Sequence, residues 1–240
     1  ILDKVEAVMK NHDIKSTDFL NPYELKTATD VLNSFQDIRW IATGGYQGAE
    51  RKVVVIFQNY IPTEAIDIPL AALVINYNGQ SGNLNHRDYL GSLLSLGIKR
   101  EKIGDIIVNE NSCYIILQKE LKDYILFHLS KVKNITISVK EIELDEIIAL
   151  PNNYKEISGS IASLRLDSIV SLGFNISRTE AQTLVSKEMV YINWGVTKKQ
   201  FHEINEGDII SVRGKGRVIV DDLQGKTKSG RRYVKLRKLI

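Results

Sequence analysis

One stretch of the chain, residues 70–139, restricts the available folds more than any other because its helices and strands alternate in a recognisable order. It opens with an apolar strand over 70–77, after which Asn85 is placed to cap a helix that stops at Gly97. Two strands, a second helix and a closing strand follow, at 102–109, 112–117, 120–130 and 133–139. The predicted order is therefore β-α-β-β-α-β.

This order is typical of ferredoxin-like and RNA-recognition (RRM-like) folds, and it predicts a domain of that type over residues 69–150. RNA-recognition sheets bind bases by stacking them on aromatic side chains of the central strands. Here the first strand has no aromatic residue before Tyr77, and the strand over 112–117 has only Tyr114. The sequence therefore favours a packing or docking role for this domain over base stacking on its sheet.

The preceding residues, 1–68, predict a small α/β domain, so the whole chain is expected to be a multidomain α+β protein. Apolar residues recur at helical spacing near the N-terminus and again over 22–35. Two strands and the glycine-rich turn of a β-hairpin follow, at 38–43, 52–58 and 44–48.

Charge divides the chain into two unlike parts. The net charge is only +3, but residues 1–160 hold 17 Lys and Arg against 21 Asp and Glu, a net −4. Residues 161–240 hold 15 against 8, a net +7. An asymmetry of this kind indicates a module that binds a polyanion at the basic end.

Composition excludes several classes of protein. With 43% hydrophobic and 25% charged residues, the chain is not disordered, collagenous or a coiled coil. The single cysteine, Cys113, excludes an internal disulfide and suits a reducing cytoplasm. The four histidines lie too far apart in sequence to predict a metal site, and no motif predicts a cofactor. No apolar run reaches the roughly 18 residues of a membrane-spanning helix, and no leader peptide is expected.

The basic part follows a stretch rich in Asn, Ser and Gly at 151–160, which we expect to be a linker. A short helix is then expected to end at Gly173. The next helix opens with a predicted capping box of Ser177 and Glu180, and its free N–H groups beside Arg178 form a site for a phosphate group. Strands are expected over 190–193, 208–213, 217–220 and 233–236.

Four short motifs in this part resemble the S-four RNA-binding domain, also called the alpha-L motif. They are Arg165-Leu166-Asp167, Ser177-Arg178 with Ala181, Val190 with Asn193, and Glu206-Gly207-Asp208 with Ile210. The resemblance implies an S-four domain over 161–240 whose two helices and a neighbouring loop face RNA.

The Arg165-Leu166-Asp167 string has a second interpretation, because pseudouridine synthases carry a catalytic Asp in a similar string. In those enzymes Thr and Gly follow soon after, whereas here Ser168-Ile169-Val170 follow. We therefore expect Asp167 to be a structural partner of a nearby Arg or backbone amide.

Motifs outside this domain resemble the YlmH family of Gram-positive bacteria, so the resemblance covers nearly the whole chain. They are His86-Arg87-Asp88-Tyr89-Leu90-Gly91, the string from Leu96 to Asp105, the turn from Gly44 to Arg51, and Gly214-Lys215-Gly216-Arg217. Trp194 stands where many S-four domains have Gly, a variant that is similar to the YlmH type. The resemblance implies a ribosome-associated RNA-binding protein that acts in quality control on obstructed large subunits, with a link to cell division.

These considerations predict an RNA face and its partners, which are large-subunit rRNA and tRNA on the ribosome. The predicted RNA-binding residues are Arg165, Ser177, Arg178, Gln182, Lys187, Lys198, Lys199, Arg213, Lys215 and Arg217. A second RNA contact by Arg87, Lys99, Arg100 and Lys102 is an alternative, and no catalytic residue or metal ligand is predicted. Two other functions stay open, namely an RNA-modifying enzyme resembling pseudouridine synthases and a docking protein of the division machinery.

Overall fold

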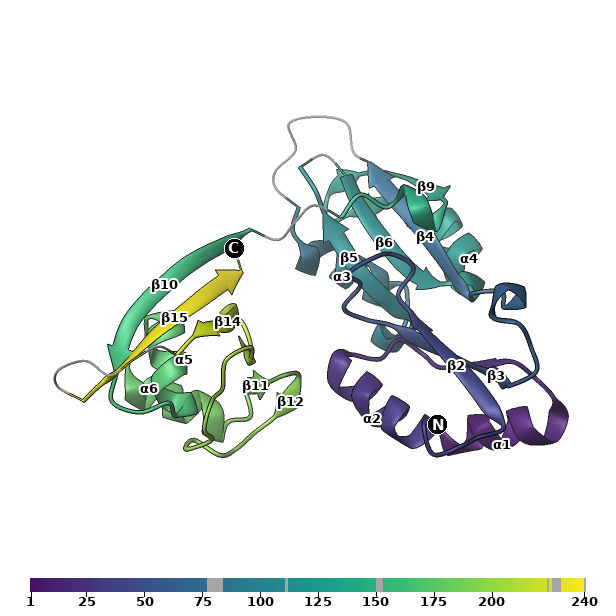
Figure 1. Cartoon of the computed structure of the whole chain (residues 1–240). Coiled ribbons are helices and arrows are strands. Elements are labelled where there is room, and N and C mark those ends of the chain that lie inside the picture. Colours follow the sequence, from purple (N-terminus) through teal and green to yellow (C-terminus); the bar gives the residue numbers. More distant parts are fainter. Residues whose placement is uncertain (77–83, 111, 150–152, 224, 226–229, 240) are drawn as a thin grey trace. The chain divides into compact units, whose positions relative to one another are not determined.

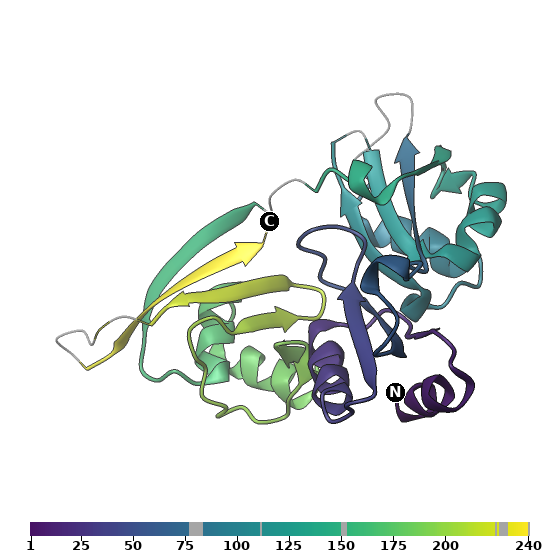
Figure 2. The same ribbon diagram turned by 45° about the vertical axis from the view of Figure 1, so that its right-hand side comes forward.

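The computed structural model of the chain describes residues 1–76, 84–110, 112–149, 153–223, 225 and 230–239. It divides into two compact units, an N-terminal unit of residues 1–150 and a C-terminal unit of residues 151–240. Short helices pack on antiparallel sheets in both units (Figures 1 and 2), which confirms the predicted multidomain α+β class.

The N-terminal unit begins with a three-stranded sheet in the order β1-β3-β2. Strand β3 is buried along its whole length because its alternate side chains enter two different cores. Val54 and Ile56 pack with Val5, Val8 and Leu32 of the first two helices, which lie against β2 and β3 in Figure 1. The elements of this part are α1 (Leu2–Asn11), β1 (Lys15–Ser16), α2 (Pro22–Leu32), β2 (Ile38–Thr43), β3 (Val53–Gln58) and η1 (Thr63–Ala65).

The second part of this unit is an antiparallel four-stranded sheet in the order β5-β6-β4-β9. Because the first and third strands are central, this is the topology of the predicted β-α-β-β-α-β domain. Asn85 caps its first helix in a capping box with Asp88, and Gly97 follows the helix at φ 82°, both as predicted. The elements are β4 (Leu70–Asn76), α3 (His86–Ser95), η2 (Arg100–Lys102), β5 (Ile103–Val108), β6 (Ser112–Gln118), η3 (Lys119–Leu121), α4 (Lys122–His128), β7 (Lys131–Val132), β8 (Ile135–Thr136), β9 (Ser138–Ile142) and η4 (Leu144–Glu146).

The closing strand was predicted at 133–139, and this is wrong. Residues 131–136 form the small β7–β8 hairpin, which turns at Lys133 with φ 54°, and the closing strand is β9. The apolar alternation of Ile135, Ile137 and Val139 continues from β8 into β9, and no Gly or Pro marks the turn at Lys133. For that reason the period of two alone could not locate the turn.

Both faces of the four-stranded sheet are covered over part of their area. Helices α3 and α4 pack on one face, where Leu73, Ile75 and Ile115 are buried. On the opposite face, Ile116 of β6 and Ile107 of β5 pack with residues of the preceding domain and of the segment after β9, including Phe19, Tyr46 and Leu144. RNA-recognition folds use this second face for bases, so its coverage supports the packing role expected from the sequence.

The C-terminal unit is a six-stranded antiparallel sheet in the order β10-β15-β14-β13-β11-β12, with two helices packed on one face. Val218, Val220 and Leu236 point from the sheet into the core, where they meet Ile169 and Val185 of the helices. Figure 2 shows the helices on one side of this sheet. The elements are β10 (Tyr154–Ile161), α5 (Leu166–Phe174), α6 (Arg178–Ser186), β11 (Val190–Ile192), β12 (Gly195–Val196), β13 (Ile209–Val212), β14 (Gly216–Asp222) and β15 (Arg232–Leu239).

Two predictions based on glycine are wrong in this unit. Residues 154–160 were expected in a linker, but they belong to β10, which pairs with β15 from Tyr154↔Leu239 to Ile161↔Arg232. A Cβ on Gly159 would lie 2.6 Å from Leu172, so this glycine marks a close approach of helix and strand. Gly173 likewise does not end α5: it packs inside the helix against Val218, and the helix ends at Phe174, with Asn175 as its C-cap at φ 51°.

Candidate nucleic-acid interface

The carboxylate of Asp167, at the start of α5, organises the predicted RNA face. It is fully buried, and it accepts hydrogen bonds from Arg178 Nε at 3.0 Å and Gln182 Nε2 at 2.8 Å of α6. Arg165 Nη2 donates to the same oxygen at 3.3 Å. The expectation that Asp167 is a structural partner of a nearby arginine is confirmed.

Charge and hydrogen bonding keep this buried carboxylate ionised. Burial by itself would raise the pKa of Asp167, but the hydrogen bonds from Gln182 and Arg178 and the charges of Arg178 and Arg165 outweigh it and lower that pKa. The two arginine side chains remain 33% (Arg165) and 47% (Arg178) exposed. One buried anion thus orients two cations that solvent can still reach.

A loop lies beside the start of α5 and adds an aromatic ring to this face. The backbone N–H of Leu166 donates to His202 O at 2.9 Å, and that of Asp167 donates to Gln200 O at 3.3 Å. These bonds place Phe201 with its ring centroid 3.7 Å from the Arg165 guanidinium carbon, while the Phe201 side chain stays 65% exposed. Arginine stacked on an exposed ring is a surface suited to a nucleobase.

Helix α6 carries ion pairs at both of its ends. Ser177 caps it by accepting from Glu180 N at 3.1 Å. The predicted return bond from Glu180 is not made among the described contacts, because the Glu180 carboxylate pairs with Lys215 of the β13–β14 turn at 3.2 Å. At the other end Lys198 pairs with Glu188 at 2.6 Å. Lys215 and Lys198 are therefore placed next to α6 by acidic residues of the same unit.

The remaining predicted residues divide by location. Lys187, Lys199 and Arg213 are exposed at the end of α6, in the adjacent loop and in the β13–β14 turn, respectively. Arg217 lies on the sheet face away from the helices, since its neighbour Val218 points into the core. It donates to Ser211 Oγ at 3.3 Å and lies over the ring of Trp194. The structure thus groups Arg165, Arg178 and Gln182 but separates Arg217 from them.

Two further motifs of the S-four resemblance, at Asn193 and Asp208, stabilise the fold of this unit. Asn193 and Trp194 form the tight β11–β12 turn at φ 47° and 66°, so the turn keeps left-handed geometry without glycine. Asn193 Nδ2 donates to Asp208 at 2.8 Å, and Asn193 Oδ1 accepts from Ile209 N at 2.9 Å. The spacing of Asn193 and Asp208 in the sequence therefore reflects one hydrogen-bonded connection between β11 and β13.

The alternative RNA contact in the N-terminal unit is not assembled as predicted. Arg100 donates to the carbonyl oxygens of Ile103 and Gly104, and burial lowers its pKa to about 10. Lys102 pairs with Asp18 at 3.0 Å and with Glu120 at 2.9 Å. Both side chains are thus committed to internal contacts, whereas Lys99 and Arg87 are exposed.

Sequence reasoning missed three candidates, namely Phe201, Lys131 and Lys133, whereas it did predict Arg87. Phe201 is preceded by Lys198-Lys199-Gln200, and an aromatic residue in such a polar segment was the available signal. Arg87 lines a groove with Lys131 and Lys133. No local signal predicted that grouping, because it depends on the β7–β8 hairpin meeting α3.

Two general properties of the described residues bear on the site. No helix in the described ranges is long and apolar enough to cross a membrane. Within the same ranges, His, Cys, Asp and Glu do not gather in threes in a way that would hold a metal ion.

Comparison with known proteins agrees with the geometry. Residues 1–61 match the family model described as YlmH, N-terminal, residues 62–146 match the putative RNA-binding domain in YlmH, and residues 164–210 match the S4 domain, which is the S-four domain of the sequence analysis. Ribosome-associated protein quality control protein P2 of Bacillus subtilis (strain 168) is 31% identical over 228 residues, 95% of this chain and 88% of that protein.

A solved structure also resembles the chain. The cell division protein ylmH from Streptococcus pneumoniae has a TM-score of 0.53 and 24% identity, covering 61% of this chain and 89% of that one. At that identity the likeness concerns the fold. The family matches and the Bacillus subtilis relative show that the chain belongs to the YlmH family.

Proposed function

We propose that this protein binds large-subunit rRNA and tRNA through its C-terminal unit and acts in ribosome-associated quality control in the cytoplasm. The matched RNA-binding models and the name of the Bacillus subtilis relative support the biological setting. The observation that carries the proposal is the orientation of Arg165 and Arg178 by the buried carboxylate of Asp167.

The donor arrangement suits a phosphate group. Arg178 binds Asp167 through Nε, so its two Nη groups remain to donate to phosphate oxygens in the bidentate manner that arginine favours. Lys215, held near the start of α6 by Glu180, adds a second positive charge. Phe201, stacked on Arg165, offers a flat apolar surface beside these donors. Phosphate and base contacts are thus available on one face.

The same geometry supports a non-catalytic role. In the alternative of a pseudouridine-synthase-like enzyme, Asp167 would be the reactive group and would have to reach the substrate. Its side chain is 0% exposed and already accepts from Arg178, Gln182 and Arg165. Mass mapping of RNA from cells that lack the protein tests this point, because a missing modification would contradict a purely binding role.

The direct test measures affinity for tRNA by fluorescence anisotropy and for large subunits by co-sedimentation. Arg178→Gln is compared with Arg237→Gln, a closely matched control: Arg237 also pairs with an aspartate, Asp221, through Nε and is 44% exposed. We expect Arg178→Gln to weaken tRNA binding about tenfold, the size of one charge-assisted bidentate contact, and Arg237→Gln less than about twofold. Equal losses would contradict the assignment of this face.

Salt dependence provides an independent check. If the face neutralises about six phosphates, the log–log slope of affinity against salt is about −4 to −5. A slope near zero would contradict phosphate recognition.

A further inference from the structure

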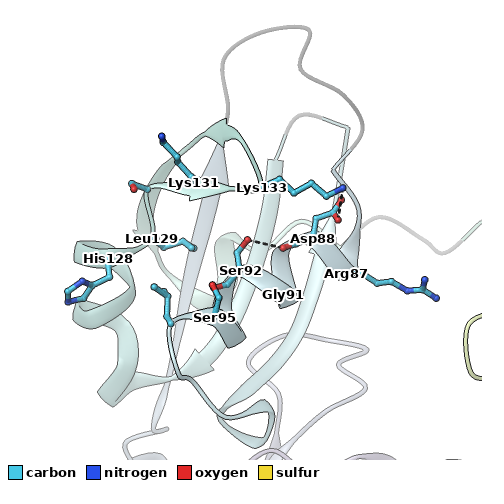
Figure 3. Close-up of a pocket in the computed structure, with 11 residues that line it drawn as sticks. Arg87, Asp88, Gly91, Ser92, Ser95, His128, Leu129, Lys131 and Lys133 are labelled. Carbon is cyan, nitrogen blue, oxygen red and sulfur yellow. Dashed lines mark hydrogen bonds and ion pairs between the residues drawn. The ribbon is translucent and has the colours of Figure 1, made fainter.

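A groove on the helix side of the four-stranded sheet has a volume of about 510 Å³. It runs between α3, the end of α4 and the β7–β8 hairpin (Figure 3). Figure 3 shows His128 at one end and Arg87 at the other, with Ser92 and Ser95 between them. Lys131 and Lys133 line it from the hairpin.

The groove is positively charged although the surrounding unit is acidic. Arg87, Lys131 and Lys133 line it, against the single carboxylate of Asp88. Asp88, whose side chain is 9% exposed, pairs with Lys133 at 2.8 Å and so fixes that ammonium group at the wall. The excess charge makes a polyanion the complementary ligand.

Exposed aromatic rings adjoin the same groove. Phe127 is 84% exposed and Tyr124 is 43% exposed, both on α4. The ring of His128 contacts both, with its centroid 4.9 Å from that of Phe127 and 4.4 Å from that of Tyr124. The Tyr124 hydroxyl donates to Leu96 O at 3.2 Å, which holds this cluster beside α3. Aromatic rings next to a basic groove are the combination that binds single-stranded nucleic acid.

The usual RNA surface of this fold is partly occupied in this protein. Ile107 and Ile116 of the opposite sheet face pack with Phe19, Tyr46 and Leu144. The packed part of that face is therefore not available to RNA, which favours the helix side of the domain as a contact surface.

We propose that this groove, together with Phe127 and Tyr124, binds an unpaired stretch of RNA. A base would stack on the rings while its neighbouring phosphates meet Lys131, Lys133 and Arg87. The inference rests on the proposed RNA-binding function and adds a second contact surface to it, on the helix side of the domain.

The test uses the full chain and two labelled probes, a single-stranded U12 RNA and a 12-base-pair RNA duplex. Phe127→Ala and Lys131→Gln are compared with Tyr60→Ala and Lys140→Gln, which remove an aromatic ring that is 64% exposed and a lysine that is exposed on β9. The comparison is made in an Arg178→Gln background to reduce binding by the C-terminal face. Circular dichroism verifies folding of every variant.

We expect Phe127→Ala and Lys131→Gln each to weaken U12 binding about fivefold, the effect of one stacked base or a small number of phosphate contacts. The control variants should change U12 binding less than about twofold, and Phe127→Ala should change duplex binding less than about twofold because a paired base cannot stack on the rings. Losses equal to those of the controls would overturn the proposal, and equal losses for both probes would overturn its preference for unpaired RNA. Reduced co-sedimentation with large subunits at unchanged U12 affinity would instead indicate a protein partner.

The two proposals fail separately. If Arg178→Gln leaves tRNA and large-subunit binding unchanged while the groove variants still weaken U12 binding, the proposed C-terminal face is wrong and the groove stands. If Arg178→Gln weakens tRNA and large-subunit binding while the groove variants leave U12 binding unchanged, the groove proposal is wrong and the C-terminal face stands.

Discussion

Asp105 in the N-terminal unit and Asp167 in the C-terminal unit each collect three strong donors, but the donors differ in kind. Asp105, on β5, accepts from the Tyr46 hydroxyl at 2.8 Å and from the backbone N–H groups of Glu50 and Arg51 at 2.7 and 3.1 Å. Asp167 accepts from two arginine side chains and one glutamine.

The difference decides what each carboxylate does. Neutral donors at Asp105 attach the β2–β3 loop to strand β5 of the four-stranded sheet. Burial together with the charge of Asp105 raises the pKa of Tyr46, so this tyrosine keeps its proton. Cationic donors at Asp167 keep further N–H groups that face solvent. The carboxylate that binds neutral donors joins two domains, whereas the one that binds cations leaves positive charge exposed at the surface.

The largest expected effect comes from Asp167→Ala, which leaves two arginines without their buried counter-charge. We expect it to lower the free energy of unfolding of the C-terminal unit by about 3 kcal/mol. Trp40 and Trp194, the two tryptophans of the chain, lie in different units, so urea unfolding followed by fluorescence in a Trp40→Phe background reports on this unit alone. Asp221→Ala, which breaks a half-exposed pair, should cost less than about 1 kcal/mol. Similar losses of unfolding free energy for Asp167→Ala and Asp221→Ala would contradict a special role of Asp167.

Asp105→Ala is expected to cost somewhat less, about 2 kcal/mol in the N-terminal unit, because the three hydrogen-bond donors that lose their partner are uncharged. Trp40 fluorescence in a Trp194→Phe background measures it. Affinity for tRNA should stay within about twofold of the parent chain, since no phosphate donor is displaced. If Asp105→Ala weakened tRNA binding as strongly as Asp167→Ala, the contrast between the two carboxylates would not hold.

Acid should affect Asp167 in a defined window. Because its folded-state pKa lies below the ordinary value of 3.8, its ionisation stabilises the folded unit fully above that value. The contribution is lost as the pH falls from about 4 through the lower folded pKa. Unfolding free energies of the parent and of Asp167→Asn, both in the Trp40→Phe background, should differ by a constant amount between pH 7 and 5 and converge below pH 4. A gap that persists unchanged at pH 3 would argue against an ionised Asp167.

The smallest effect on stability is expected at Phe201, whose ring contacts Arg165 from outside. Phe201→Ala should cost about 0.5 kcal/mol in unfolding, yet weaken tRNA binding about fivefold through the loss of a stacking surface. Phe201→Tyr should retain that affinity and Phe201→Leu should not. A full recovery by leucine would mean that bulk, not the aromatic face, matters there.

Features that depend on residues close together in the chain could be predicted from the sequence. Features that depend on contacts between distant elements could not. The cap at Asn85 and the stop at Gly97 depend on residues within one helical turn, and both are confirmed. Gly159 and Gly173 were misinterpreted because the groups that exclude a side chain there, Leu172 and Val218, come from other elements.

The same limit applies to the site. The resemblance to the S-four domain predicted Arg165, Arg178 and Gln182 as RNA-binding residues, and the structure brings all three to one carboxylate. Sequence alone could not show that Arg217 belongs to the opposite sheet face or that Lys102 is taken by Asp18, because strand pairing and domain packing decide both.

The pairing of β10 with β15 has a consequence for how the protein is made. The first strand of the C-terminal unit joins the last, with Tyr154 opposite Leu239. During translation β10 leaves the ribosome some 70 residues before β15, and until then its edge has no partner in the final sheet. Helices α5 and α6 close their hydrogen bonds within each helix and can begin to form earlier, whereas completion of the sheet awaits release of residues 232–239 from the exit tunnel. A nascent chain stalled within this last segment holds an unfinished copy of the RNA-binding unit.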